Sequence, residues 1–464
     1  MTRTPRHPLL SPQPSPLARA VALPAVALGL TASLFASALP ATAAPTEPLS
    51  QPTAEALSES EEAALEDVAE AEVQDRAEAM EELAETTDTD FYATPATLPG
   101  APGTLIRSEA MDFYLDPVKL IRHSATATRI LYTSTNAAGD TVPVSGTVLA
   151  PTAAWKGQGE RPVIGYGVGT QGLADRCAPS RALSTGQEYE GLVISSLLSQ
   201  GYTVVVTDYE GLGTEGMHTY MVRESQGHAV LDSLRAAAQL PDSGVTAETP
   251  AALAGYSQGG GAAASAAELA PGYAPELNLK GAYAGAVPAD LFAVADLIDG
   301  SLYSEFLQFA MGGQFAAAGL DPATYLNEDG LELLDEASEN CTVDGLLEHP
   351  FLDSSDLTLT GQHLKDLVRS DATLEAVISE QRLGDGRAPE IPMVVSHSLL
   401  DDVVPYSTGR DLASRWCDEG ATVSLDTTAL PTHIGGYVGG IPRMTAFLDA
   451  RFKGWTPLDA CWRL

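Results

Sequence analysis

The stretch TPAALAGYSQGGGAAASAAELA, residues 249–270, places Ser257 between two glycines, where a short apolar run gives way to a run of small residues. The apolar run predicts a strand, and the alanine-rich residues after the serine predict a helix. Gly-x-Ser-x-Gly between a strand and a helix is typical of a nucleophile elbow, a sharp turn that lifts a serine hydroxyl out of a sheet. Gly255 and Gly259 fit this interpretation because strand and helix pass close together there. The alternative is an ordinary glycine-rich turn.

On both sides of this stretch, short apolar strands alternate with helices, which predicts an α/β fold: a mostly parallel sheet with helices on both faces. Residues 129–151 predict two further strands joined by a loop. Residues 290–389 have a helical pattern without a clear strand, and are far longer than an ordinary connection. We therefore expect an α/β-hydrolase core at 91–289 and 390–464, with an inserted helical cap, or lid, at 290–389. The alternating strands are predicted at residues 162–167, 203–208, 251–256, 280–287, 391–398 and 421–427, and the main helices at 190–201, 227–240 and 443–454.

The first 90 residues differ from the rest in composition. Residues 1–44 combine early arginines, an apolar run at 20–40 and the small residues ATAA at 41–44, which predicts a secretory signal peptide that is removed on export. A membrane anchor is the alternative, but prolines interrupt the apolar run. Residues 45–90 hold sixteen acidic residues against one basic residue, Arg76. Such a segment is a solvated linker or, alternatively, a pro-segment.

Charge and cysteine content exclude several classes of function. The net charge of −37 argues against nucleic acid and anionic membrane surfaces as partners, because phosphate groups favour lysine and arginine. After the first 44 residues, no stretch approaches the roughly 18 apolar residues that a spanning helix needs. The four cysteines form no close ligand pair, so we predict no metal and no cofactor. In an exported chain they suggest two disulfides, with three possible pairings.

A serine nucleophile needs a base and an acid, and in this type of fold they follow it in the order acid, then histidine. His433 lies in a glycine-rich segment, LPTHIGGYVGG, which we expect to be a loop just before the last helix. His397 ends a predicted strand and is better explained as a structural residue. Asp401 and Asp402 follow that strand, and either one can orient the imidazole.

The oxyanion of the reaction needs two backbone N–H donors. One is predicted at Gln258, directly after the serine. The other is expected in the glycine-rich loop GYGVGTQG at 165–172, at Thr170 or Gln171.

These motifs together resemble a known family, the secretory lipases related to the yeast-type lipase A. The resemblance runs from about residue 91 to residue 454. It is carried by PGTLIRSE (102–109), GTQGLADRCAPS (169–180), GYTVVVTDYEGLGT (201–214), GYSQGG (255–260), APELNLKGAYAGAVPADL (274–291), DDVVPY (401–406), TH (432–433) and FLDARFKG (447–454).

The resemblance implies an α/β hydrolase with a helical lid that acts on carboxylic esters, usually triacylglycerols. It implies a triad of Ser257, Asp401 and His433, because the family's acid stands four residues before the proline of DDVVP. It also implies Gln171 as the second oxyanion residue. The bridges that it implies are Cys177–Cys341, which would tie the oxyanion loop to the cap, and Cys417–Cys461.

The sequence thus predicts a secreted serine lipase or carboxylesterase that forms an acyl-enzyme on Ser257. Its substrate would be a lipid or another ester, met at a lipid–water interface if it is a true lipase. A short-chain esterase and an acyltransferase with the same triad are alternatives, and a non-catalytic hydrolase-like binding protein is a further one.

Overall fold

The computed structural model of the chain describes residues 90–241 and 243–464. The predicted signal peptide at 1–44, and all but the last residue of the acidic segment at 45–90, lie outside the described residues. Among the residues that are described, no helix is both long enough and apolar enough to cross a membrane.

The centre of the fold is one mixed sheet, in which the described residues form nine strands in the order β1-β2-β3-β5-β4-β6-β7-β8-β9. The pairs β1–β2, β2–β3 and β3–β5 are antiparallel, whereas the strands from β5 to β9 run parallel. The strands are β1 (Leu105–Met111), β2 (Thr126–Thr135), β3 (Thr141–Ala150), β4 (Val163–Gly167), β5 (Thr203–Glu210), β6 (Ala251–Tyr256), β7 (Leu279–Gly285), β8 (Met393–Ser398) and β9 (Val423–Thr428).

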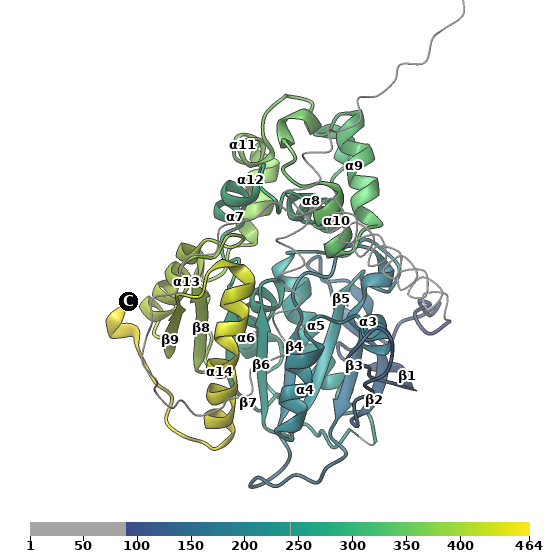
Figure 1. Cartoon of the computed structure of the whole chain (residues 1–464), viewed down its shortest axis with the longest axis vertical. Coiled ribbons are helices and arrows are strands. Elements are labelled where there is room, and N and C mark those ends of the chain that lie inside the picture. The colour runs from purple at the N-terminus through teal and green to yellow at the C-terminus, as the bar shows by residue number, and fades with distance from the viewer. Residues whose placement is uncertain (1–89, 242) are drawn as a thin grey trace, which may run out of the picture. The chain divides into compact units, whose positions relative to one another are not determined.

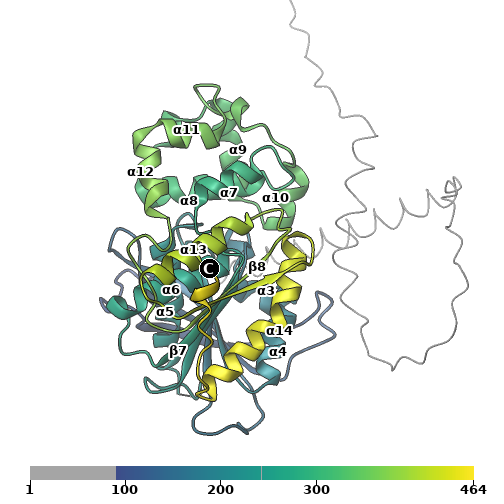
Figure 2. The same ribbon diagram turned by 90° about the vertical axis from the view of Figure 1, so that its left-hand side faces the viewer.

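Helices cover both faces of this sheet, as the sequence predicted. Figure 2 shows α5 and α6 on one side and α4 and α14 on the other. The helices of this body, the part of the fold built on the sheet, are α3 (Pro179–Thr185), α4 (Gly191–Ser199), α5 (Arg223–Ala237), α6 (Gln258–Tyr273), α13 (Tyr406–Asp418) and α14 (Thr432–Phe452), with short 3-10 turns η1 (Asp175–Cys177) and η4 (Cys461–Arg463).

A helical cap lies between β7 and β8 in the chain and sits over the carboxyl ends of the parallel strands (Figure 1). All of its helices fall inside the segment 290–389 that the sequence predicted as a cap. They are α7 (Leu291–Ile298), α8 (Glu305–Ala318), α9 (Glu328–Ser338), α10 (Thr342–Glu348), α11 (Leu364–Ser370) and α12 (Ala372–Glu380), with η2 (Pro322–Thr324) and η3 (Ser354–Leu357).

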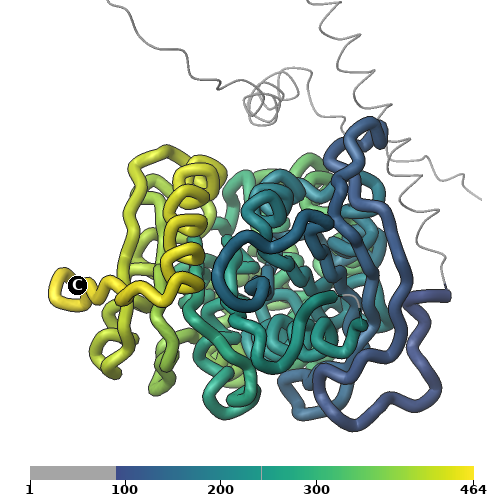
Figure 3. Tube along the Cα trace, turned by 90° about the horizontal axis from the view of Figure 1, so that it is seen from below, coloured from purple at the N-terminus to yellow at the C-terminus, as the bar shows by residue number. Residues whose placement is uncertain are grey.

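The central strands are buried on both faces, which explains why they appear in the sequence as continuous apolar runs. Every residue of β4, β6 and β8 is buried. Strands of a parallel sheet that is covered on both sides have this character. By contrast, β1 lies at one edge, is only partly buried, and has three consecutive polar residues, Arg107 to Glu109, in place of an apolar run or an alternating pattern, so its sequence contains no clear strand signal. Figure 3 shows this N-terminal edge opposite the edge where the C-terminal segment leaves the body.

Two disulfides join distant segments. Cys177 of η1 is bonded to Cys341, directly before α10 of the cap, with 5.6 Å between their Cα atoms. Cys417 of α13 is bonded to Cys461 near the C-terminus, with 5.5 Å between their Cα atoms. These are the pairings that the family resemblance implies.

We expect the contact between α6 and β4 to tolerate no side chain at Gly259. A Cβ atom there would lie 1.9 Å from the backbone oxygen of Gly167, which cannot move without displacing β4. Gly259→Ala should therefore lower the free energy of unfolding by at least about 3 kcal/mol, measured by denaturant unfolding under non-reducing conditions. The control is Gly272→Ala in the same helix, where a Cβ would meet nothing within 4 Å. Equal stability of the two variants would contradict the prediction.

Candidate active site

Ser257 lies in a sharp turn between β6 and α6, as the nucleophile-elbow pattern predicted. Its backbone has φ 58° and ψ −122°, a region that residues other than glycine rarely adopt. Its N–H donates to the carbonyl of Gly285 on the neighbouring strand β7 at 3.0 Å, and its own carbonyl accepts from Gly261 at 2.9 Å. These bonds hold the strained turn in place.

Glycines make this turn possible, because the backbone of α6 nearly touches the ends of three strands. A Cβ atom on Gly255 would lie 2.2 Å from the oxygen of Gly259, and one on Gly260 would lie 2.0 Å from the oxygen of Gly285. The expectation that strand and helix pass close together at the GYSQGG motif is confirmed.

The structure brings His433 and Asp401 into direct contact. The Nδ1 atom of His433 lies 2.8 Å and 3.0 Å from the two carboxylate oxygens of Asp401. The Asp401 side chain is fully buried, and its Oδ1 also accepts from the N–H groups of Val403 and Val404. Burial alone would raise the pKa of Asp401, but the contact with His433, the N–H of Val404 and the nearby His397 hold it below its ordinary value. The acid is thus kept ionised against the imidazole.

Tyr256, the residue before the serine, holds the same histidine from the other side. Its hydroxyl donates to the backbone carbonyl of His433 at 2.7 Å, and the two rings lie 5.0 Å apart. Strand β6 therefore positions both Ser257 and the backbone of His433.

His433 does not lie in a loop, contrary to the sequence prediction. Helix α14 begins at Thr432, eleven residues earlier than predicted, so His433 is in its first turn. The glycines that suggested a loop are needed for packing: a Cβ on Gly436 would lie 2.5 Å from the Tyr256 hydroxyl, and one on Gly440 would lie 2.3 Å from the Tyr283 hydroxyl. Glycine allows the helix to approach the sheet, and that approach outweighs its low helix propensity.

Of the two acids that the sequence offered as partners of the imidazole, Asp402 does not contact the ring and instead holds the backbone at the start of α14. Its Oδ1 accepts from the backbone N–H of His433 at 2.8 Å, at the start of α14. Its Oδ2 accepts from the hydroxyl of Tyr303, a residue of the cap, at 3.0 Å. Asp402 therefore links the cap to the backbone of the histidine.

His397 has the structural surroundings that its position at a strand end suggested. It is 1% exposed, and its Nε2 lies 2.9 Å from the carbonyl of Val404. Its Nε2 is also 3.6 Å from Asp401 Oδ2. Burial lowers the pKa of His397, so it lies beside the acid as a neutral side chain.

The two predicted oxyanion residues occupy different settings. Gln258 is the first residue of α6, where backbone N–H groups have no partner within the helix. Gln171 is 8% exposed, and its carbonyl accepts from the N–H of Thr342 in the cap at 2.8 Å. Its side-chain amide donates to the carbonyl of Gly169 at 3.3 Å and to Glu188 at 3.4 Å. The Gln171 side chain is thus bonded within its own surroundings. The group of Gln171 to consider as an oxyanion donor is therefore its backbone N–H.

Two buried glutamates, which sequence reasoning missed, support this loop from behind. Glu190 accepts from the N–H of Gly169 at 2.6 Å and from the hydroxyls of Tyr166 and Tyr437. Burial, and then the charge of Glu190, raise the pKa of Glu188 to about 8. Burial also raises the pKa of Glu190, to about 7. Near neutral pH the folded protein therefore retains protons on these two carboxyl groups.

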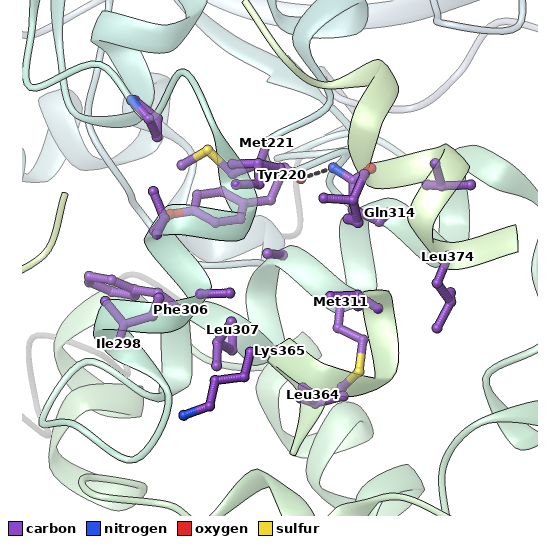
Figure 4. Close-up of a pocket in the computed structure, with 18 of the residues that line it drawn as sticks. Tyr220, Met221, Ile298, Phe306, Leu307, Met311, Gln314, Leu364, Lys365 and Leu374 are labelled. Atoms are coloured by element: carbon purple, nitrogen blue, oxygen red, sulfur yellow. Dashed lines mark hydrogen bonds between the residues drawn. The ribbon is translucent and has the colours of Figure 1, made fainter. Parts of the chain in front are cut away.

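An apolar pocket leads from Ser257 into the cap. Apart from the serine, it is lined by Tyr220 and Met221 of the body, by Val403 and Val404 of the loop after β8, and mostly by aliphatic and aromatic side chains of α7, α8, α11 and α12 (Figure 4). Gln314 and Lys365 are the cap residues with polar side chains that line it. Among the described residues we find no cluster of histidine, cysteine or acidic side chains able to hold a metal ion.

A serine elbow after one strand of a parallel sheet, with an acid and a histidine after later strands, defines an α/β hydrolase. The model of the secretory lipase family matches residues 177–460. A Mycobacterium tuberculosis protein described as a probable inactive lipase is 30% identical over 379 residues, covering 79% of this chain and 82% of its own. A secreted triacylglycerol lipase of Malassezia restricta is 27% identical over 389 residues, covering 80% of each chain. The chain belongs to the secretory lipase family.

The fold also matches solved structures. The closed state of Candida antarctica lipase A superimposes with a TM-score of 0.68 at 23% identity, over 80% of this chain and 87% of that one. The rice cell wall degrading esterase from Xanthomonas oryzae matches with a TM-score of 0.64 at 18% identity, over 77% of this chain and all of its own. At these identities the likeness establishes the fold alone.

The two neighbouring acids should both matter, for different reasons. Asp401→Ala removes the partner of the imidazole and should lower kcat about 10⁴-fold. Asp402→Ala removes the acceptor for the His433 N–H and should lower kcat about ten- to a hundredfold with little change in KM, because the ring loses its position. Tyr303→Phe should have a smaller effect in the same direction. Hydrolysis of one ester by all three variants, with an unfolding midpoint for each, checks this. An Asp402→Ala variant within about threefold of the parent would contradict it.

Stability should fall as the pH rises from about 5 to about 8. The folded chain keeps protons on Glu188 and Glu190 that the unfolded chain releases above about pH 4.3, so deprotonation favours unfolding in this window. Glu188→Gln should flatten the dependence of the unfolding midpoint on pH. The exposed Glu332 of α9 provides the matched control, Glu332→Gln, which should leave the slope as it is. If the unfolding midpoint depended on pH equally in the parent and in both variants, the buried pair would have no role in the pH dependence of stability.

Proposed function

We propose that the protein is a secreted serine ester hydrolase, a lipase or carboxylesterase, that works through an acyl-enzyme on Ser257. The observation that carries the proposal is the position of Ser257. It is a strained elbow residue that lines an apolar pocket, and it directly follows Tyr256, the strand residue that bonds to the backbone of His433. The Asp401–His433 pair on the same side of the sheet supports it.

In this proposal His433 Nε2 takes the proton of the Ser257 hydroxyl as the oxygen attacks the ester carbonyl. Asp401 holds the Nδ1–H and stabilises the imidazolium that forms. The backbone N–H groups of Gln258 and Gln171 receive the oxyanion, helped by the N-terminus of α6. His433 then gives the proton to the leaving alcohol. A water molecule, activated by the same histidine, releases the acid and restores the serine.

The pocket supports an apolar acyl chain as part of the substrate. Its lining comes mainly from aliphatic and aromatic residues of the cap, and burial of a hydrocarbon chain against such a lining contributes about 0.8 kcal/mol per methylene group. We therefore favour lipids, triacylglycerols among them, over esters of short acids. An acyltransferase would use the same residues, and the partition of the acyl group between water and an added alcohol distinguishes the two.

Export of the protein is part of the proposal. The secretory lipase family and the two disulfides in the structure support an oxidising, extracellular location.

A non-catalytic role is the competing function, because one relative is described as a probable inactive lipase. The presence of a serine, an acid and a histidine in the arrangement described above argues against it here. The discriminating measurement is covalent labelling with a fluorophosphonate probe, which reacts only with an activated serine.

Ser257→Ala should abolish ester hydrolysis while the protein still folds. Loss of the nucleophile should lower turnover on the order of 10⁶-fold. Release of fatty acid from a triacylglycerol emulsion and fluorophosphonate labelling should both be measured, with circular dichroism as the folding control. Activity within tenfold of the parent would refute the assignment of Ser257.

A further inference from the structure

Gln314 is a buried amide in the wall of the apolar pocket. It belongs to α8 of the cap, is 4% exposed and lines the same pocket as Ser257. Its Nε2 donates to the backbone carbonyl of Tyr220 at 3.4 Å, whereas its Oε1 is buried without a hydrogen-bond partner in the part of the chain that the structure describes. Figure 4 shows the amide among the pocket residues, with its bond to Tyr220.

The orientation of this amide is set by its surroundings. If the nitrogen and oxygen exchanged places, Oε1 would face the carbonyl oxygen of Tyr220, and two acceptors would repel each other. The oxygen must therefore be the free end. A buried amide oxygen without a donor is unfavourable by an amount comparable to a lost hydrogen bond, and so a donor from a ligand would be favoured there.

Among the described residues that line the pocket, the other polar groups near Gln314 already have partners. Lys365 also lines the pocket, but its ammonium lies 3.9 Å from the buried carboxylate of Asp299, and Figure 4 shows it directed away from Gln314. The hydroxyl of Tyr220 is bonded to Thr170 at 2.7 Å. The residues one turn before Gln314, Ala310 and Met311, are apolar and line the same wall.

We propose that Gln314 Oε1 is a specificity-determining hydrogen-bond acceptor that selects acyl chains carrying a hydroxyl group. This inference rests on the proposed function, because the acyl chain is placed in the pocket by attachment to Ser257. We place the hydroxyl on the acyl chain because the pocket extends from the serine into the cap. An apolar wall with one hydrogen-bond acceptor fits a hydrocarbon chain with one polar substituent.

The test is a hydroxyl scan along the acyl chain. Esters of one alcohol with saturated C18 acids, either unsubstituted or with a hydroxyl at successive positions, are hydrolysed by the parent protein. One position, or two adjacent positions, should be preferred over the unsubstituted chain by about tenfold in kcat/KM, the size expected for one neutral hydrogen bond. No preference at any position would overturn the inference, and this arm does not depend on whether a variant folds.

Gln314→Leu should remove the preference, measured as the ratio of kcat/KM for the hydroxylated ester to kcat/KM for the unsubstituted ester with the same variant. The matched control is Gln362→Leu, an exposed glutamine of the cap, which should keep the preference. A preference that survives Gln314→Leu would overturn the assignment. A second set of substrates, monoesters of diols, carries the hydroxyl on the alcohol part of the ester. A preference for these substrates that depends on Gln314 would show that Gln314 contacts the alcohol part, and would overturn the inference.

The two proposals fail in different ways. If no ester is hydrolysed in a Ser257-dependent manner, the proposed function fails. If the unsubstituted ester is hydrolysed in a Ser257-dependent manner and the hydroxyl scan is flat, only the role of Gln314 fails.

Discussion

The close approach of helix α6 to the ends of β4, β6 and β7 is the constraint on which the site depends. At Gly255, Gly259 and Gly260 an added Cβ atom would lie 1.9 to 2.2 Å from a backbone oxygen. This contact forces the chain through a turn too sharp for an ordinary residue, and Ser257 takes the strained conformation at its apex. The same contact sets the N-terminus of α6 beside the loop after β4. One packing contact thus positions the proposed nucleophile and both proposed oxyanion donors.

The cap is attached to both halves of the site. On the oxyanion side, the Cys177–Cys341 bridge and the hydrogen bond from Thr342 to Gln171 join α10 to the loop after β4. On the histidine side, Tyr303 reaches Asp402, which holds the His433 N–H. A displacement of the cap would therefore change the backbone positions of two functional groups. The apolar pocket and the proposed catalytic residues are therefore linked through the cap, which lines the pocket and contacts the backbone of Gln171 and the side chain of Asp402.

Much of this architecture could be predicted from the sequence, because the central strands are apolar runs and the elbow has a distinctive pattern. The start of α14 was mispredicted because its glycines look like a loop, and only the contacts of Gly436 and Gly440 show why a helix needs them. Glu188 and Glu190 carry no sequence signal. Glu188 precedes the helix predicted at 190–201 and Glu190 is its first residue. Glu190 is buried against the hydroxyls of Tyr166 and Tyr437, and Glu188 against Gln171 and the N–H of Glu190. The link from the cap to His433 through Asp402 could not be predicted either, because it depends on Tyr303, which lies 99 positions from Asp402 in the sequence.

Buried polar groups without a hydrogen-bond partner occur in several parts of the described chain, and some of them lie in the cap and behind the loop after β4. In the described part of the cap, oxygen atoms of Glu305, Gln308 and Gln314 are buried without a hydrogen bond, and Glu188 has such an oxygen behind the oxyanion loop. Each group lowers stability, so its retention needs a reason. Glu188 is explained by a raised pKa, which keeps the acid neutral, and the same holds for Glu305, where burial raises the pKa to about 7. Gln314 cannot be neutralised in this way, because an amide has no proton to gain near neutral pH. Gln308 is also an amide and shares this property, but of these two amides Gln314 is the one that lines the pocket, where the proposed contact with a ligand would satisfy its oxygen.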